Sequence, residues 1–266
     1  MVRILRGLIF LALIAIPIVF YSALHKDNKR YKAIPILNNS RPAQFKPAIA
    51  LLFDDLGDSL SDLRELYSLD IPLTVSIIPN LKFSKNIAHI ASRCGFSVFI
   101  HLPLEPKQEE IYQSPRFHFL SPGLSRRENE ALLRDYLNSL RIAIGVNNHM
   151  GSKATEDGQF MGFLMKMIKK RGLAFVDSRT SLDSVAYQVC QQNGLICGFS
   201  EGFLDGIDEL GHIEKQIDQL AREAKAKGKI IIIAHPRSNT LKALKKKIPW
   251  LKQKINFITL KEYFSL

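Results

Sequence analysis

The sequence contains few cysteines, and they lack the spacing of metal ligands. Cys94, Cys190 and Cys197 are odd in number, which excludes a fully paired disulfide framework and gives no support to a cysteine-based metal site. Cys94 stands just before Gly95 at the end of a helical pattern, so we expect it to be a buried free thiol. A disulfide between Cys190 and Cys197 is possible outside the cytoplasm, but we do not favour it.

Acidic residues are scarce beside basic ones: 25 Asp and Glu stand against 37 Lys and Arg, for a formal net charge of +12. Much of the excess lies in two clusters. They consist of Lys26, Lys29, Arg30 and Lys32, and of Lys242, Lys245, Lys246, Lys247, Lys252 and Lys254. No nucleic-acid motif or aromatic and basic platform accompanies them, so we expect no nucleic-acid partner. Attraction to anionic lipid or an acidic wall polymer explains a basic surface equally well.

One long stretch near the N-terminus, Gly7–Leu24, has no charged residue. Its length is at the lower limit for crossing a bilayer and exceeds that of a usual signal peptide core. A small-residue cleavage site is missing, so we predict an uncleaved signal anchor over residues 1–24 and a flexible tether over 25–46. The basic flank after the stretch argues against export. The chemistry inferred below belongs outside, so we expect inner-membrane anchoring with the domain facing the periplasm.

From residue 47 onward, apolar segments alternate with amphipathic helical patterns. The predicted strands are Ala48–Phe53, Leu73–Ile78, Ser97–Leu102, Ala143–Asn147, Leu173–Val176, Leu195–Phe199 and Lys229–Ala234. The predicted helices include Ser59–Ser68, Ser84–Arg93, Arg126–Leu140, Gln159–Arg171 and Ile213–Lys227. Ser125 and Glu128 form a predicted capping box. Seven repeats of this kind indicate one α/β domain over residues 47–266, either a parallel barrel or a doubly wound sheet.

Two adjacent carboxylates, Asp54 and Asp55, end the first predicted strand and precede Leu56 and Gly57. The apolar run before them is typical of a strand buried on both faces. Burying an unpaired carboxylate is costly, so packing does not explain the pair. Ligands and catalytic groups gather at the carboxyl ends of strands in α/β folds. We therefore interpret the pair as the opening of an active site.

Polar residues, most of them ionisable, follow every predicted strand except the second. They are Asp54 and Asp55, then His101 and Glu105, then Asn147, Asn148 and His149, then Asp177 and Arg179, then Glu201 and Asp205, and finally His235. In a parallel sheet these positions share one rim. Imidazole and carboxylate together suit zinc or another borderline first-row metal. The sequence thus predicts a metal site at this rim.

Five segments in order resemble the divergent polysaccharide deacetylase family, a relative of the NodB-type deacetylases. They are Asp54–Gly57, His101–Pro106, Gly145–Ser152, Val176–Thr180 and His235–Arg237. The resemblance covers about residues 47–262. It implies a seven-stranded parallel (β/α) barrel of the TIM type, export or membrane anchoring, an N-acetylated polysaccharide substrate and one divalent metal, for which we expect zinc.

Carried over by position, the resemblance implies that Asp54 is the general base and His235 the general acid. It implies further that Asp55 and His101 are metal ligands. The chain departs from the family's pattern at Glu105, where a second metal histidine is usual, and at Asn147–Met150, where an arginine motif is usual.

These departures shift the predicted roles. His149 becomes the natural third ligand with Asp55 and His101, while Glu105 either ligates instead or holds a ligand histidine. Arg179 is the candidate for pairing with Asp54 and keeping it ionised. The predicted substrate-binding residues are Asn147, Asn148, Asp177 and Asp205.

Three functions remain open. The first is a metal-dependent de-N-acetylase acting on an envelope or wall polysaccharide. The second is a catalytically degenerate barrel that serves as a glycan-binding or envelope scaffold protein, and the departures from the family's pattern favour it. The third is another metal hydrolase acting on a phosphoester or peptide. Metal content and acetate release from an N-acetylated glycan distinguish them.

Overall fold

A computed structural model describes residues 46–107 and 117–266 of the chain. The predicted anchor, and the tether apart from Lys46, lie outside the described residues. Among the residues described, no helix is long and apolar enough to cross a membrane.

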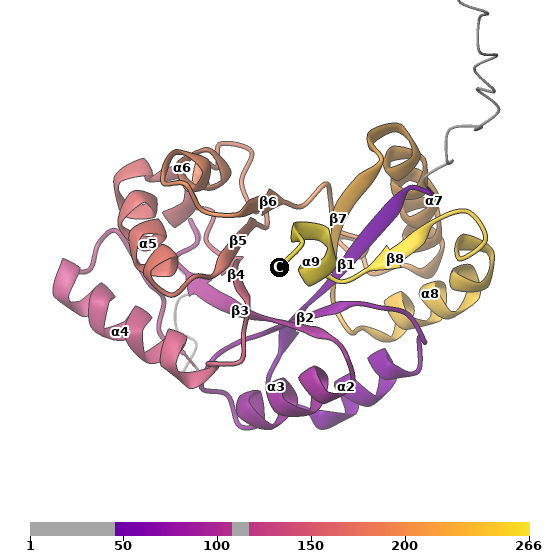
Figure 1. Cartoon of the computed structure of the whole chain (residues 1–266), viewed down its shortest axis with the longest axis horizontal. Coiled ribbons are helices and arrows are strands. Elements are labelled where there is room, and N and C mark those ends of the chain that lie inside the picture. The colour runs from indigo at the N-terminus through magenta and orange to yellow at the C-terminus, as the bar shows by residue number, and fades with distance from the viewer. Residues whose placement is uncertain (1–45, 108–116) are drawn as a thin grey trace, which may run out of the picture. The chain divides into compact units, whose positions relative to one another are not determined.

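A parallel sheet curves into a nearly closed barrel (Figure 1). Its strands are β1 (Ala48–Leu56), β2 (Thr74–Ile77), β3 (Ser97–Leu104), β4 (Gly145–Met150), β5 (Ala174–Asp177), β6 (Cys197–Phe199) and β7 (Lys229–Ala234). They follow the order β6-β5-β4-β3-β2-β1-β7. The segment after β6 completes the circle, because Phe203 bridges to Ile233 and the Leu204 backbone N–H donates to the Ile233 carbonyl. The predicted seven-stranded barrel is confirmed, and the doubly wound alternative is excluded.

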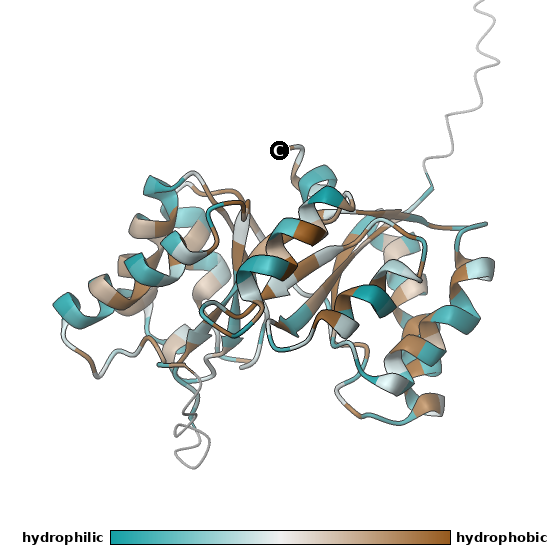
Figure 2. Ribbon diagram, turned by 90° about the horizontal axis from the view of Figure 1, so that it is seen from below, coloured by the Kyte–Doolittle hydropathy of each residue, from teal (hydrophilic) through white to brown (hydrophobic). Residues whose placement is uncertain are grey.

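The strands are largely apolar apart from polar residues near their carboxyl ends, while the helices outside them mix apolar and polar residues (Figure 2). The helices are α2 (Leu60–Tyr67), α3 (Ser84–Arg93), α4 (Arg126–Ser139), α5 (Gly158–Lys170), α6 (Ala186–Gln192), α7 (Leu210–Lys227), α8 (Ser238–Leu251) and α9 (Leu260–Phe264). The capping box of Ser125 and Glu128 opens α4 as predicted. Helices α6, α8 and α9 were not among the predicted helices. In α8, the dense lysines and Pro249 obscure the amphipathic pattern.

A short last strand and helix close the amino end of the barrel, where the strands begin. Strand β8 (Asn256–Ile258) pairs with the first three residues of β1, before the point at which β2 begins to pair. Helix α9 then inserts Leu260, which is fully buried. Its backbone N–H donates to Thr74 Oγ1 over 2.8 Å. A Cβ at Gly198 would lie 2.9 Å from the Phe264 ring, so glycine leaves room for this plug. The plug leaves the carboxyl end of the barrel for chemistry.

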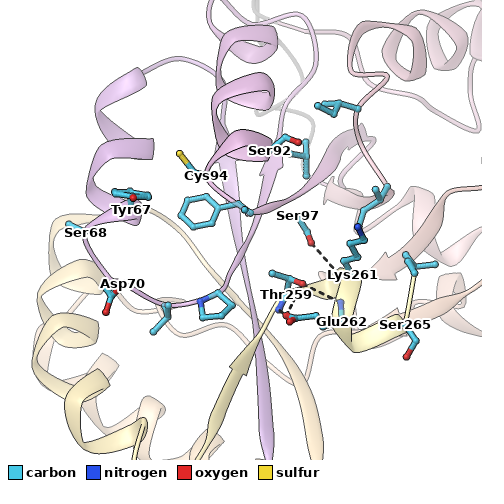
Figure 3. Close-up of a pocket in the computed structure, with 18 residues that line it drawn as sticks. Tyr67, Ser68, Asp70, Ser92, Cys94, Ser97, Thr259, Lys261, Glu262 and Ser265 are labelled. Carbon is cyan, nitrogen blue, oxygen red and sulfur yellow. Dashed lines mark hydrogen bonds between the residues drawn. The ribbon is translucent and has the colours of Figure 1, made fainter.

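A groove of about 1270 Å³ lies at the amino end (Figure 3). It is bordered by the segments that lead into β2 and β4, by the start of β3 and by α9. Its polar groups serve the fold: Ser97 Oγ accepts from the Lys261 backbone N–H, and Thr259 Oγ1 accepts from that of Glu262. The groove is thus remote from the rim at which the sequence predicts a site.

The C-terminal lysine cluster forms ion pairs between helices. The pairs are Lys245 with Glu65, Lys246 with Glu214, Lys247 with Asp218 and Lys252 with Asp70, at 2.7 to 3.0 Å. Much of the basic character of this segment is therefore balanced by nearby carboxylates.

The cysteine predictions were right in part: Cys94 is free, as expected, but it is not buried, and the disulfide that we did not favour is present. Cys190 and Cys197 form a disulfide, which joins α6 to β6. Helix α6 and strand β6 are consecutive and are connected by a tight turn at Gly194, where φ is +66°. The chain reverses direction in this turn, which brings the two sulfur atoms together. Cys94 is exposed, because it caps the last turn of α3 on the outside of the barrel.

Candidate metal centre and active site

An irregularity at the end of β1 brings two neighbouring carboxylates to the same place. Side chains alternate between the two faces of a regular strand. Here the pairing with β2 shifts register between Phe53 and Leu56, and Asp55 has a φ of +63°. As a result Asp54 Oδ2 lies 3.6 Å and Asp55 Oδ1 lies 3.1 Å from the same atom, His101 Nε2. The bulge is what turns both carboxylates toward the rim.

Asp55, His101 and His149 come together from β1, β3 and β4. Asp55 Oδ1 is 3.1 Å from His101 Nε2 and 2.9 Å from His149 Nδ1. The two imidazoles meet edge to face, with centroids 4.8 Å apart. Their spacing follows from the register of β3 and β4, in which His101 lies beside Asn147 and Pro103 beside His149. One donor atom from each of the three residues lies within 4.8 Å of the other two.

The donor set fits a divalent metal. Asp55 Oδ1 is buried and accepts no hydrogen bond, although two imidazole nitrogens approach it closely. A buried oxygen of this kind is expected to have a partner. Two imidazoles and a carboxylate are ligands of borderline cations such as zinc. Burial opposes ionisation of Asp55, but His101 and His149 outweigh it and hold the pKa of Asp55 well below its usual range. The carboxylate is therefore ionised and ready to ligate.

Asp54 is buried beside this cluster and is held by a neutral amide. Asn147 Nδ2 lies 3.0 and 3.1 Å from the two carboxylate oxygens, and Asn147 Oδ1 accepts from Ser76 Oγ. Burial raises the pKa of Asp54 to about 6, against the opposing effects of His101 and His235. A carboxyl with this pKa is mostly ionised at neutral pH yet binds a proton more readily than an ordinary aspartate. These are the properties of a general base.

His235 follows β7 and is oriented by Asp205. Its Nδ1 lies 2.9 Å from Asp205 Oδ1, and its backbone N–H donates to Asp205 Oδ2 over 2.8 Å. Thr240 Oγ1 also donates to Asp205 Oδ2, which fixes the carboxylate. Burial would lower the pKa of His235, but the bond to Asp205 and its charge raise it. The other ring nitrogen, Nε2, lies 3.6 Å from Asp55 Oδ2, so His235 reaches the centre in a form suited to donating a proton.

The predicted substrate-binding residues are all buried and hydrogen-bonded within the protein. They are Asn147, Asn148, Asp177 and Asp205, none more than 1% exposed. Asn148 joins β4 to the loop after β5 through the Ser178 backbone N–H. Asp177 accepts from the backbone N–H groups of Arg179 and Tyr187. All four residues are therefore engaged in contacts within the protein, and their role in binding substrate stays a prediction.

Glu105 and Arg179 also differ from expectation. Strand β3 bridges to Leu120 at its end, so Glu105 turns to the loops, where it accepts from Ser121 Oγ over 2.5 Å and from Lys153 Nζ over 2.8 Å. It does not belong to the cluster of potential metal ligands. Arg179 lies in a left-handed turn with its guanidinium 3.8 Å above the Phe199 ring. Within the described ranges no ion pair joins it to Asp54, whose polar partner is Asn147.

Sequence reasoning missed two aromatic rings beside the histidines. Phe117 meets His149 edge to face at 5.3 Å between centroids. Phe203 stacks nearly parallel to His235 at 6.2 Å. Phe203 lies between Glu201 and Asp205, after the sixth predicted strand, so these polar neighbours could have indicated that it lies at the rim. Phe117 follows no predicted strand, and nothing in the sequence around it indicates a position at the rim.

The fold and rim define a class: a parallel β/α barrel with a carboxylate and histidine cluster at the ends of its strands. More particularly, the chain belongs to the divergent polysaccharide deacetylase family, whose model matches residues 51–264. It is 31% identical over 196 residues to an uncharacterized protein of Haemophilus influenzae, across 74% of this chain and 69% of that protein. The resemblance found in the sequence is thereby confirmed.

Solved structures show the same fold. An uncharacterized protein from Agrobacterium tumefaciens C58 superposes with a TM-score of 0.75 at 22% identity, covering 82% of this chain and 89% of that one. Two more distant structures each have a TM-score of 0.51. The Bc1960 peptidoglycan N-acetylglucosamine deacetylase is 18% identical over 83% of this chain and 89% of that one. A mutant of BA3943, a CE4 family pseudoenzyme from Bacillus anthracis, is 14% identical over 82% of this chain and 67% of that one.

Proposed function

We propose that this protein is a metal-dependent de-N-acetylase acting on an N-acetylated polysaccharide of the cell envelope. The observation that carries the proposal is the contact of buried Asp54 with the cluster of Asp55, His101 and His149, with His235 on the other side of Asp55. Amide hydrolysis needs a base for water, a stabiliser of negative charge and an acid for the amine. The three kinds of group stand within one rim.

Asp55, His101 and His149 are the residues that would hold the ion, which we expect to be zinc. A divalent ion held there supplies Lewis-acid chemistry for amide hydrolysis. Asp54 accepts the proton of the attacking water, while Asn147 keeps its two carboxylate oxygens in place. His235 Nε2 gives a proton to the departing amine, and Asp205 stabilises the imidazolium through Nδ1. Acetate and a free amino sugar are the products.

Two observations support a substrate outside the cytoplasm. The Cys190–Cys197 disulfide is typical of proteins in oxidising compartments. One structural neighbour, Bc1960, is named as a peptidoglycan N-acetylglucosamine deacetylase. We therefore keep the proposal of a chain anchored in the inner membrane through Gly7–Leu24, with its barrel in the periplasm. A phosphatase fusion after Ser40 tests it: activity supports export, whereas activity only of a cytoplasmic fluorescent reporter at the same site contradicts it.

The second candidate is a barrel without catalysis that binds glycan or organises the envelope. Its specific support is that no arginine or lysine forms an ion pair with Asp54 among the described residues, together with a pseudoenzyme among the structural neighbours. On this alternative the metal-loaded protein releases no acetate.

The metal site is tested first by elemental analysis of purified protein. His101→Ala and His149→Ala should each lose the ion, because each removes one of three ligands. The control is His89→Ala, a change on the outer helix α3, which should leave occupancy unchanged. Full occupancy in the His149→Ala protein would show that the ligand set is wrong.

The activity is tested by acetate release from peptidoglycan fragments and chitooligosaccharides. The metal-loaded protein should release acetate, and removal of the ion by a chelator should stop it. Two results together would support the non-catalytic candidate. The purified protein, fully loaded with metal, releases no acetate from either glycan, and a strain that carries Asp54→Asn has an unchanged envelope phenotype.

A further inference from the structure

A basic groove on the outside of the barrel is not explained by the proposed chemistry. It occupies about 390 Å³ between the last turns of α7 and α8, which lie side by side (Figure 1). Arg222 and Lys225 reach it from α7, and Lys254 reaches it from the loop after α8. Within the part of the chain that the structure describes, none of the three forms an ion pair, whereas Asp218, the acid of the groove, is paired with Lys247. Three unneutralised cations therefore face solvent together.

Trp250 accompanies these cations and is 44% exposed. Lys254 Nζ lies 4.2 Å above its ring. It is the only tryptophan in the sequence. An indole at a surface has an apolar body and a polar N–H, which suits the boundary between water and lipid. Attraction to the helix dipole would account for Lys225 in the last turn of α7, but it does not explain an exposed indole among three cations.

The groove lies where the N-terminal segment joins the barrel. Ala48 N–H donates to the Gly228 carbonyl just after α7, and the Pro47 carbonyl accepts from Asn256 N–H, two residues after Lys254. The exposed Lys46 precedes this junction. Residues 1–45, with the apolar stretch Gly7–Leu24, are thus attached at the amino end of the barrel, and the candidate active site lies at the opposite, carboxyl end.

We propose that this groove binds the surface of an anionic phospholipid membrane. Charge complementarity supplies the attraction, since a cation near an anionic lipid surface increases membrane affinity by about fivefold. Trp250 supplies an interfacial contact. The first described residues of the chain lie at the same end of the barrel as the groove. The rim of Asp54 and His235 lies at the opposite end of the barrel, so docking through this groove leaves it uncovered.

The single tryptophan makes the test specific to the groove. The full-length chain is reconstituted into vesicles of phosphatidylcholine alone, or of phosphatidylcholine with phosphatidylglycerol, and each set is prepared with and without brominated acyl chains. Bromine quenches an indole that lies at the lipid boundary. We expect strong quenching of Trp250 in the anionic vesicles, little in the neutral ones, and loss of the difference at high salt.

Two double variants with equal charge change separate the groove from net charge. Arg222→Glu with Lys225→Glu should reduce the ratio of docked to undocked protein at least about tenfold, by removing two attractive cations. Lys166→Glu with Lys170→Glu on α5 should leave quenching unchanged. The ratio of brominated to unbrominated signal corrects for any change in intrinsic Trp250 fluorescence. Equal quenching in neutral and anionic vesicles, or equal loss in both variants, overturns the proposal. So does a Trp250 response to a soluble acidic polysaccharide with none to anionic vesicles.

Discussion

The two ends of this barrel treat charge in opposite ways. At the carboxyl end, Asp54 and His101 are almost fully buried and face like and unlike charges within a few ångströms. Around the amino end and outer helices, lysines such as Lys245 and Lys252 pair with carboxylates in solvent, while the interior is filled by Leu260. Burying charged groups at the carboxyl end destabilises the fold, and these groups are the ones proposed to act on substrate. Apolar packing at the amino end stabilises the same barrel.

The comparison shows that the number of charged residues in a segment indicates function less well than whether those residues are buried or exposed. The lysine cluster is conspicuous in the sequence, but much of it is balanced across α2, α7 and α8. The rim contains few charges, and they act on one another because burial removes the screening of water. Four experiments test this difference.

The largest effect should follow Asp54→Asn, which removes the proposed general base at the carboxyl end. General-base catalysis contributes about a hundred- to ten-thousand-fold in rate, so kcat for acetate release should fall by that factor. The bound metal should remain, since Asp55 supplies the ligand. Asp70→Asn, which changes a surface carboxylate at the amino end, is the matched control and should leave kcat unchanged. Loss of metal with Asp54→Asn would place this residue among the ligands.

Leu260→Ala tests the packing at the other end. The side chain is fully buried in the plug, so its truncation should lower the free energy of unfolding by about 2 to 5 kcal/mol. Leu182→Ala changes the same side chain where it is fully exposed and should have almost no effect. Denaturant unfolding measures both. Similar values for the two variants would mean that α9 does not contribute to the core.

The cost of burying Asp54 should appear in the pH dependence of stability. Its pKa is raised from 3.8 to about 6, so the unfolded chain loses this proton at a lower pH than the native one. Stability is therefore lost as pH rises from about 3.8 to about 6, and the loss persists above that range. In metal-free protein at pH 7, Asp54→Asn should raise the free energy of unfolding by on the order of 2 to 3 kcal/mol. The gain should vanish near pH 3; an equal gain at both pH values would contradict the assignment.

The smallest effect should come from an ion pair between outer helices. Lys247→Gln removes the contact with Asp218, and because both groups are accessible to water the loss should be at most about 1 kcal/mol. Lys242→Gln, on the same helix, controls for the change in net charge. Thermal or denaturant unfolding resolves the difference. A loss as large as that of Leu260→Ala would break the contrast between the two ends.

Much of the fold could be predicted because its signals are local. Apolar runs locate the seven barrel strands, and Ser84–Arg93 is a helix with the predicted bounds. Strand β8 could not be predicted in this way, because Asn256–Ile258 is short and gains its stability from pairing with β1 at the far end of the sequence. Helix α9 is similarly short, and only its contacts inside the barrel explain it.

The candidate site was predictable to the level of which residues meet. Asp55, His101 and His149 follow parallel strands, and such strands deliver their ends to one rim. The partners within the rim were not predictable, because they depend on the bulge in β1 and on side-chain direction. Asn147 thus takes the place foreseen for Arg179 beside Asp54, and Asp205 contacts His235, a pairing that the sequence did not indicate.

Because β8 pairs with β1, the barrel cannot finish folding until residues 256–258 have been synthesised. The first strand forms part of its ladder with Asn256–Ile258, and the interior acquires its plug only when Leu260 arrives. Contacts so distant along the chain form late, since loop closure must precede them. A nascent chain that crosses a membrane therefore has almost its whole length on the far side before the barrel can close. If the chain is exported as proposed, the rim therefore forms after transport, in the compartment where the Cys190–Cys197 disulfide also forms.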